Sequence, residues 1–244
     1  MRINQVIKSV TELFNNSNIC QSHNINHVLR VKNHVSRAFE CIDNNQYSMK
    51  MRDLAECAAI LHDADDKKFY MIGDKFPNKF KNAQEIMLNA NYDQDDIDLV
   101  IKMISYVSSS ENGDNVPPDA QKNEYLLYPR FADRLEAGGF EGVKRCYQYT
   151  LSINRPLFTS DSLKPHSIYD VWIIATQERY NNYKGNSASM IDHYYDKLLR
   201  LNNFETTNEY FIKEKEKILS PLLLVIEQFI QNNLTHKYMQ TFLE

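Results

Sequence analysis

The sequence predicts an all-α protein. Apolar residues recur at intervals of three, four and seven, which is the spacing of a helix that buries one face. Glycine and proline are scarce, with 6 and 7 residues, so few helices are expected to be interrupted from within. No stretch alternates apolar and polar residues in the manner of a half-buried strand. We therefore expect about nine or ten helices of ordinary length.

Most of the predicted helices carry their apolar residues as a continuous stripe. Four stripes stand out, in residues 25–42, 54–61, 97–104 and 191–201. A further helix is predicted to open at Pro129 and to close at Gly138-Gly139. Proline is favoured in the first turn of a helix, and glycine is favoured just past its end.

Two polar segments, residues 108–124 and 181–189, interrupt the helical pattern. The first contains a glycine and a Pro-Pro pair and is predicted to be a loop. It either covers a binding site or simply connects two helices. In the second segment, Ser187 or Ser189 is placed to cap the helix that follows.

We expect the second loop to divide the chain into two parts. Residues 1–180 would form a helical core, and residues 181–244 would form a C-terminal helical extension packed on it. The most apolar window, residues 218–230, is too short to span a bilayer and contains Pro221 and Glu227. It either completes the core or forms a surface for a partner.

The composition argues against several classes of protein. The net charge is −4 and no block of Lys and Arg stands out, so no nucleic-acid partner is expected. The 4 cysteines form no CxxC pair and predict neither a zinc knuckle nor a disulfide framework. Residues 1–16 are amphipathic and broken by charge, unlike a signal peptide. We expect a cytoplasmic protein with a small-molecule partner and no membrane association, and a homo-oligomer is left open.

The stretch AAILHDADDKKF, residues 58–69, ends an apolar helix in a cluster of charges. Taken alone, His62-Asp63 fits an ordinary helix C-terminus, where a histidine lies near the negative end of the helix dipole. His27 lies roughly 60° from the centre of the valine stripe, at the edge of the buried face. A histidine there can reach inward to a ligand.

Asp133 lies between apolar residues on the helix predicted after Pro129. It is either a surface ion-pair partner or a carboxylate directed at a cation. Together with the histidines it completes a set of two imidazoles and two carboxylates: His27, His62, Asp63 and Asp133. Such nitrogen and oxygen ligands suit a borderline or hard divalent ion whose octahedron is completed by waters. They suit a tetrahedral structural zinc ion less well.

Four motifs in this order resemble those of the HD superfamily of metal-dependent phosphohydrolases: NHVLRV, ILHDADD, FADRLEA and MIDHYYDKLL. The resemblance is closest to a bacterial-type branch whose motifs read L-H-D-x-D-D-x-K-F and I-N-H-F-Y-x-K-L-L. It spans about residues 20–200 and implies an HD-domain helical bundle. Asp192 stands where that branch has Asn, which bears on substrate preference.

The resemblance implies a role for each matching residue. The expected metal ligands are His27, His62, Asp63 and Asp133. Asp66 matches the acid that orients or deprotonates the attacking water, and Lys68 matches a lysine that contacts phosphate. The expected substrate contacts are His23, Arg30, Arg134, Arg155, His193 and Lys197. The chemistry agrees, because a divalent ion activates water, a carboxylate accepts its proton, and cations hold phosphate oxygens.

The implied reaction is hydrolysis of (deoxy)nucleoside triphosphates to monophosphate and pyrophosphate. A 5′-nucleotidase, an alarmone pyrophosphohydrolase and a non-catalytic nucleotide-binding module are the alternatives. Since all four ligands are retained with Asp66 and Lys68, an enzyme is favoured. No histidine occurs between His62 and His166, so the extra histidines of two-metal branches are missing. We expect one divalent ion, Mn²⁺ first, with Mg²⁺, Co²⁺, Ni²⁺ or Fe²⁺ as alternatives.

Overall fold

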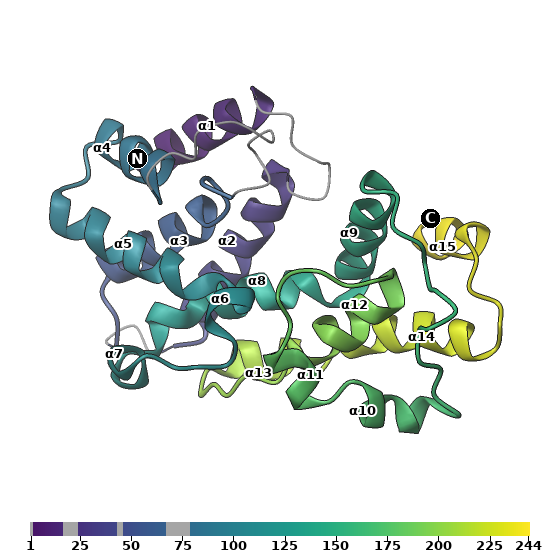
Figure 1. Cartoon of the computed structure of the whole chain (residues 1–244). Helices are drawn as coiled ribbons and strands as arrows, with labels where there is room; N and C mark the ends of the chain where they lie inside the picture. Colours follow the sequence, from purple (N-terminus) through teal and green to yellow (C-terminus); the bar gives the residue numbers. More distant parts are fainter. Residues whose placement is uncertain (1, 17–23, 43–45, 67–78) are drawn as a thin grey trace. The chain divides into compact units, whose positions relative to one another are not determined.

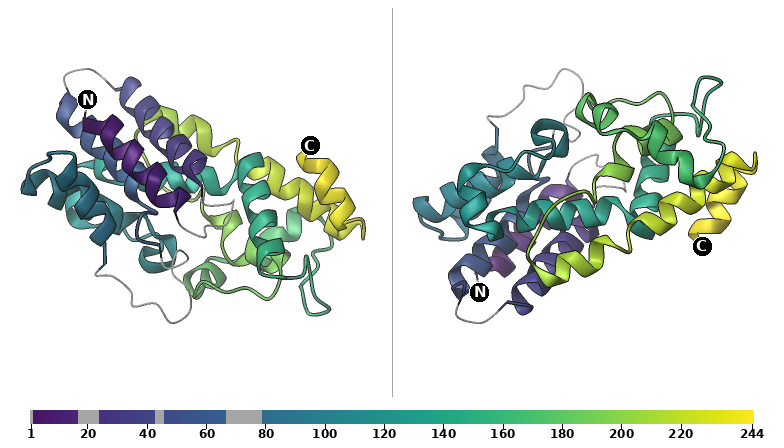
Figure 2. Two further views of the ribbon diagram at one scale, coloured as in Figure 1. Left: turned by 90° about the horizontal axis from the view of Figure 1, so that it is seen from above. Right: turned by 90° about the horizontal axis from the view of Figure 1, so that it is seen from below.

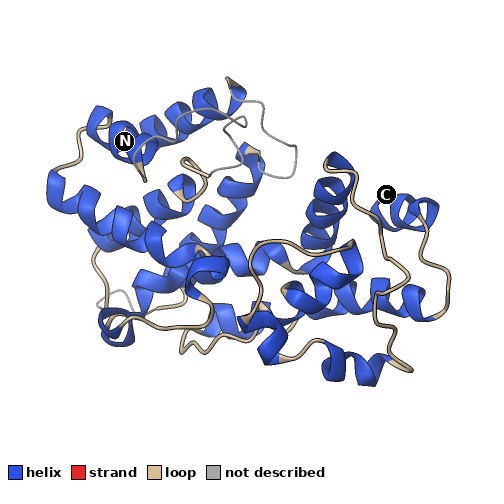
Figure 3. Cartoon of the chain, viewed as in Figure 1, coloured by secondary structure: helices blue, strands red, loops and turns tan. Residues whose placement is uncertain are grey.

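The computed structural model describes residues 2–16, 24–42, 46–66 and 79–244. These residues form helices and connecting turns, with no strand among them (Figure 3). The all-α prediction is confirmed. Between residues 168 and 200 the helices are shorter than the sequence stripes predict, since this stretch is broken into pieces of 3 to 7 residues.

The chain forms two compact units. Unit 1 consists of Met1–Ser108, Asn115–Asp133 and Thr206–Phe211, and unit 2 consists of Ser109–Asp114, Arg134–Glu205 and Ile212–Glu244. The division passes through two helices, which therefore contribute residues to both units. The predicted division into a helical core of residues 1–180 and an extension of residues 181–244 stays a prediction.

Unit 1 contains most of the N-terminal helices (Figure 1). They are α1 (Arg2–Asn15), α2 (Ile25–Glu40), α3 (Met49–Leu61), α4 (Lys81–Asn89), α5 (Gln94–Val107), α7 (Pro118–Lys122), the 3-10 helix η3 (Glu124–Leu127) and the first part of α8 (Tyr128–Ala137).

Helix α3 lies at the centre of unit 1. All of its residues from Leu54 to Leu61 are buried, and it packs against α1, α2 and α5 (Figure 2). The predicted valine stripe of α2 is also buried, with Val28, Val31 and Val35 fully inaccessible to solvent. The ligand-bearing end of α3 is thus held by helices packed around it.

Side-chain caps fix where three helices of unit 1 begin. Asn24 accepts hydrogen bonds from the backbone N–H groups of Asn26 and His27 at the start of α2. Ser48 caps α3 and Asp93 caps α5 in the same way. Because a cap sets the first residue of a helix, Asn24 also sets the angular position of His27 in the first turn.

Unit 2 contains the remaining helices. They are α6 (Ser109–Asn112), the end of α8, α9 (Gly139–Ser152), η4 (Ile168–Asp170), α10 (Val171–Ile174), α11 (Gln177–Asn181), α12 (Met190–Asp196), η5 (Leu198–Arg200), α14 (Leu219–Ile230), α15 (His236–Leu243) and the end of α13 (Glu209–Lys215).

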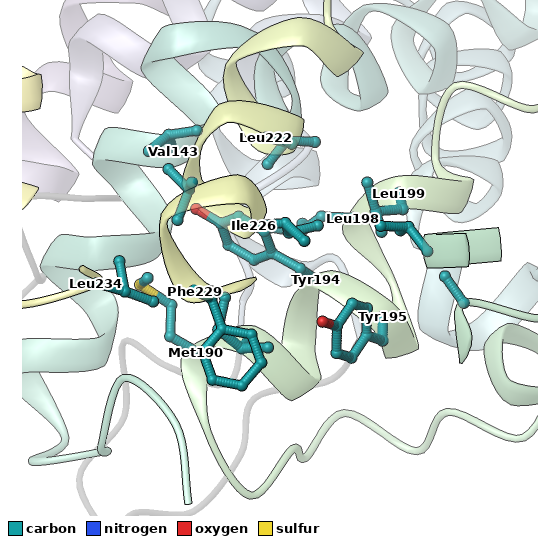
Figure 4. Packing of buried hydrophobic residues seen from close by; sticks show 14 of the residues in the cluster. Val143, Met190, Tyr194, Tyr195, Leu198, Leu199, Leu222, Ile226, Phe229 and Leu234 are labelled. Carbon is teal, nitrogen blue, oxygen red and sulfur yellow. The ribbon is translucent and has the colours of Figure 1, made fainter. Parts of the chain in front are cut away.

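The core of unit 2 forms where α9, α12 and α14 meet. Tyr194, Leu222 and Ile226 are fully buried there, and Val143 comes from α9 (Figure 4). The apolar window of residues 218–230 becomes α14 and fills this core. No helix in the described ranges is both long and apolar enough to cross a membrane.

The two polar segments, residues 108–124 and 181–189, are predicted to be loops, and the second is also predicted to supply a helix cap. The segment 108–124 is not the plain loop predicted from its sequence, because it includes α6 and α7. In the second segment, Ser189 is the residue that caps α12, accepting from the backbone N–H of Asp192 at 3.1 Å. Ser187 instead donates to Asp196 at 2.5 Å.

Candidate metal centre

Three elements of unit 1 bring the four predicted ligands together. His27 lies in the first turn of α2, and His62 ends α3 as its C-cap residue. Asp63 follows in the next turn, and Asp133 comes from α8. The side chains of His27 and His62 are only 1% and 3% exposed. His27 is therefore further inside than the edge position expected from its helical phase.

The four side chains converge on one point. His27 Nε2 lies 3.6 Å from Asp63 Oδ2 and 3.3 Å from Asp133 Oδ1. His62 Nε2 lies 3.4 Å and 3.6 Å from the same two oxygens. Ligand atoms of His27, His62 and Asp133 all lie within 4.8 Å of one another.

These separations fit ligands of a common ion. Two N or O atoms that each bind an ion at about 2.1 Å lie about 3.0–3.4 Å apart at octahedral or tetrahedral angles. The observed distances of 3.3 to 3.6 Å are close to that spacing and longer than most direct hydrogen bonds. The buried Nε2 atom of His62 makes no hydrogen bond within the described part of the chain. The residues present therefore fit a divalent ion.

A backbone contact orients the ring of His62. Its Nδ1 atom lies 2.7 Å from the carbonyl oxygen of Ala59, one turn earlier on α3. If Nδ1–H donates to that carbonyl, Nε2 is the ring nitrogen that faces the carboxylates and that would bind an ion. This is the usual arrangement of a metal-binding histidine, whose second nitrogen is fixed by a hydrogen bond.

The electrostatics of the centre favour positive charge. Burial alone lowers the pKa of His62, but the carboxylates of Asp63 and Asp133 outweigh it and raise that pKa to about 9. Burial would also raise the pKa of Asp133, yet His27 and His62 hold it well below the usual range. The same carboxylates that attract a proton to the imidazole would attract a divalent cation.

The turn after α3 carries the predicted acid Asp66. Two backbone bonds close it, from Ala64 N–H to Leu61 O at 2.9 Å and from Asp66 N–H to Asp63 O at 3.1 Å. Asp66 is half-buried and lies at the end of the turn that begins with His62 and Asp63. Lys68 and His23 lie outside the described residues, and their roles stay predictions.

Sequence reasoning missed the role of Asp65. Its carboxylate accepts the backbone N–H groups of Asn82 at 2.8 Å and Ala83 at 3.0 Å, at the start of α4. The sequence favours a solvated loop residue at this position. The partner lies 17 residues further along the chain, and nothing in the spacing points to it.

Arg30 and Arg134 were expected to contact substrate. Arg30 is half-buried on α2, one turn after His27. Arg134 is only 2% exposed, and it donates to Asp114 Oδ1 at 2.9 Å and to the Gly113 carbonyl at 2.5 Å. The guanidinium of Arg134 therefore holds a turn of unit 2, and contact with a substrate stays a prediction.

Arg155, His193 and Lys197 lie near one another in unit 2. His193 Nδ1 is 3.3 Å from the hydroxyl of Tyr183, and the ammonium of Lys197 lies 5.9 Å from the centre of that ring. Arg155 donates to the side chain of Asn186 at 3.1 Å. Lys197 and His193 thus lie beside the ring of Tyr183, and contact of the three residues with substrate stays a prediction.

Comparison with known proteins finds a viral relative of similar length. No family model matches it. The uncharacterized protein L803 of Acanthamoeba polyphaga mimivirus is 31% identical over 222 residues, covering 86% of this chain and 88% of that protein.

Several solved structures share the architecture. A Lactobacillus plantarum protein aligns with 95% of this chain and 96% of its own, at a TM-score of 0.66 and 19% identity. Bacillus subtilis YpgQ in complex with ADP gives a TM-score of 0.61 over 95% and 96%, at 19% identity. An HD-superfamily hydrolase of Bacillus thuringiensis gives 0.55 over 95% and 96%, also at 19% identity. The fold is therefore of the HD type, and the chain belongs to the same family as the mimivirus protein L803.

Proposed function

We propose that this protein is a metal-dependent phosphohydrolase that acts on a small phosphorylated metabolite. The observation that carries the proposal is the convergence of His27, His62, Asp63 and Asp133 in unit 1, at the separations expected of ligands of one ion. Bound there, a divalent ion would lower the pKa of a water and neutralise charge on phosphoryl oxygens. The mixed nitrogen and oxygen set accepts several divalent ions, and we propose Mn²⁺ first, with Mg²⁺, Co²⁺, Ni²⁺ and Fe²⁺ as alternatives.

Asp66 is the residue to which we assign proton acceptance from the attacking water. Two acids follow the ligands in the turn, but Asp65 accepts two backbone N–H groups of α4. A carboxylate whose two oxygens both accept backbone N–H groups is committed to those bonds, so its position makes it a poor acceptor for the proton of a water. Asp66, half-buried three residues after Asp63, is the better candidate.

A nucleotide is the substrate class that we propose. YpgQ, which shares this fold at 19% identity, has been solved in complex with ADP. Substrate contacts of Arg155, His193 and Lys197 are proposed from the sequence motifs alone, and Arg155 and Lys197 carry the positive charge that holds phosphate oxygens. The proposed reaction is hydrolysis of (deoxy)nucleoside triphosphates to monophosphate and pyrophosphate, in the cytoplasm.

The test measures orthophosphate and pyrophosphate released from nucleoside mono-, di- and triphosphates and from guanosine tetraphosphate. Each divalent metal is supplied in turn, and His62→Ala is the control. We expect pyrophosphate from the triphosphates and none from the variant. Orthophosphate from monophosphates would instead make the protein a nucleotidase, and pyrophosphate from guanosine tetraphosphate an alarmone hydrolase. Nucleotide binding without turnover under any metal would favour the non-catalytic module.

A further inference from the structure

Helix α4 begins without a cap of its own. The residue before it is Phe80, which has a left-handed φ of 69° and no capping side chain. Asp65 fills that role from a distance, with Oδ1 accepting from Asn82 N–H at 2.8 Å and Oδ2 from Ala83 N–H at 3.0 Å. The side chain of Asn82 donates back to the carbonyl of Ala64 at 2.9 Å. These three bonds form a reciprocal clamp between the turn after α3 and the start of α4.

The clamp is bonded to Ala64 and Asp65, in the middle of the turn that carries two of the proposed ligands. His62 and Asp63 lie on one side of Ala64-Asp65, and Asp66 lies on the other. Ala64 itself is fully buried. Displacing this pair by a fraction of an ångström would displace the residues on both sides of it.

Helix α4 is a firm support for such a clamp. Ala83 and Met87 are fully buried, and Ile86 is 8% exposed. The helix packs against α1 and α5, both within unit 1. A group bonded to its first turn is therefore tied to the packed part of the unit and not to a free loop.

We propose that Asp65 is a positioning residue that, with Asn82, fixes the turn of residues 62–66 on α4 and so sets the place of His62 and Asp63. The proposal rests on the metal centre proposed above. It gives the two adjacent acids different roles, since Asp65 would hold the turn while Asp66 is the proposed proton acceptor. Partners of this kind, one step removed from the metal, typically change metal affinity by about 10- to 100-fold when they are lost.

The experiment titrates the metal-free protein with Co²⁺ and reads both the affinity and the visible absorption of the bound ion. The variants are Asp65→Ala, Asp65→Asn and Asn82→Ala. The matched control is Asp93→Ala, because Asp93 caps α5 by accepting from Asp96 N–H at 2.9 Å, and α5 carries none of the four proposed ligands. Thermal unfolding is measured for every variant.

We expect Asp65→Ala to weaken Co²⁺ binding by about 10- to 100-fold and to alter the absorption band. Asp65→Asn and Asn82→Ala should lose less, because each leaves part of the clamp in place. Asp93→Ala should lower the melting temperature yet bind Co²⁺ within about twofold of the native protein, since it removes only a helix cap. If Asp65→Ala fails to fold, the milder Asn82→Ala still decides the question.

Native Co²⁺ affinity in Asp65→Ala, with a loss of stability like that of Asp93→Ala, would reduce Asp65 to a helix cap and overturn the proposal. Native Co²⁺ affinity with lost turnover would make Asp65 a reacting group and overturn it as well. In both cases loss of binding in His62→Ala would leave the metal centre standing. If the native protein binds no Co²⁺, the centre and the role of Asp65 fall together.

Discussion

Asp133 is the proposed ligand with the clearest electrostatic signature. Its carboxylate lies 3.3 Å from His27 Nε2 and 3.6 Å from His62 Nε2, and these two histidines hold its pKa well below the usual range although burial opposes them. Asp133→Asn keeps the shape and removes the charge, so we expect metal-dependent turnover to fall by at least ~100-fold. Phosphate release measures the loss, and circular dichroism checks that the helices persist. Turnover at the native level would remove Asp133 from the ligand set.

The cysteines give a second prediction at the scale of single residues. Burial raises the pKa of the Cys57 and Cys146 thiols to about 12, whereas Cys41 is exposed. A raised pKa leaves very little thiolate at pH 8, and the thiolate is the reactive form. In a Cys20→Ser background, iodoacetamide should label Cys41 at once, the half-buried Cys146 slowly and the buried Cys57 only after unfolding. Mass spectrometry of the labelled peptides would contradict the packing if Cys57 reacted as fast as Cys41.

The position of a single residue can be predicted from the sequence when its own helix sets that position, and not when a distant segment sets it. His27 could be placed near the core from its phase on one helix, and it is found 1% exposed. The carboxylate of Asp65 accepts a hydrogen bond from the backbone N–H of Asn82, which is 17 residues away. No periodicity carries information about such a contact, because it forms only once α4 has packed.

At the scale of the helices, space is tight at the junction between α8 and α9. A Cβ atom on Gly142 would lie 2.4 Å from the carbonyl carbon and oxygen of Ala137, which are backbone atoms and cannot rotate away. Gly142→Ala should therefore destabilise the protein by about 1–3 kcal/mol. Urea unfolding measures this, with Leu151→Ala, an exposed position on α9, as a control that should change stability by less than ~0.5 kcal/mol. An unchanged unfolding midpoint for Gly142→Ala would show that this junction is wrongly placed.

Long helices with stripes and caps were predictable, and short ones were not. The helix expected after Pro129 is α8, which runs from Tyr128 to Ala137 and ends before Gly138-Gly139 as predicted. Helices α6 and α7 have only 4 and 5 residues, too few to be stable by propensity. Arg134 donates to the carbonyl oxygen of Gly113, just after α6, at 2.5 Å. This tertiary contact cannot be seen in the local sequence, where glycine and proline suggest only a loop.

At the scale of the whole molecule, metal binding should increase the free energy of unfolding. A ligand that binds only the folded protein stabilises it by RT ln(1 + [L]/Kd), which is about 2.7 kcal/mol at a concentration of 100 Kd. We therefore expect the melting temperature to rise when Mn²⁺ replaces EDTA, and His62→Ala to show no such rise. An equal rise in the variant would mean that Mn²⁺ acts at another place.

The fold alone does not settle what the protein does. The HD-type architecture is shared with a hydrolase and with YpgQ at 19% identity, while the mimivirus relative is uncharacterized. Function has to be argued from the site, because one fold hosts many activities. In this protein, two histidines and two aspartates are brought together from α2, α8 and the end of α3, and they carry the proposed function.

The most direct test of that central claim is the anomalous scattering of Mn²⁺ in crystals of the protein grown with the metal. We expect one strong peak within bonding distance of His27 Nε2, His62 Nε2 and the carboxylates of Asp63 and Asp133. A peak elsewhere, with these four side chains packed only on each other, would contradict it.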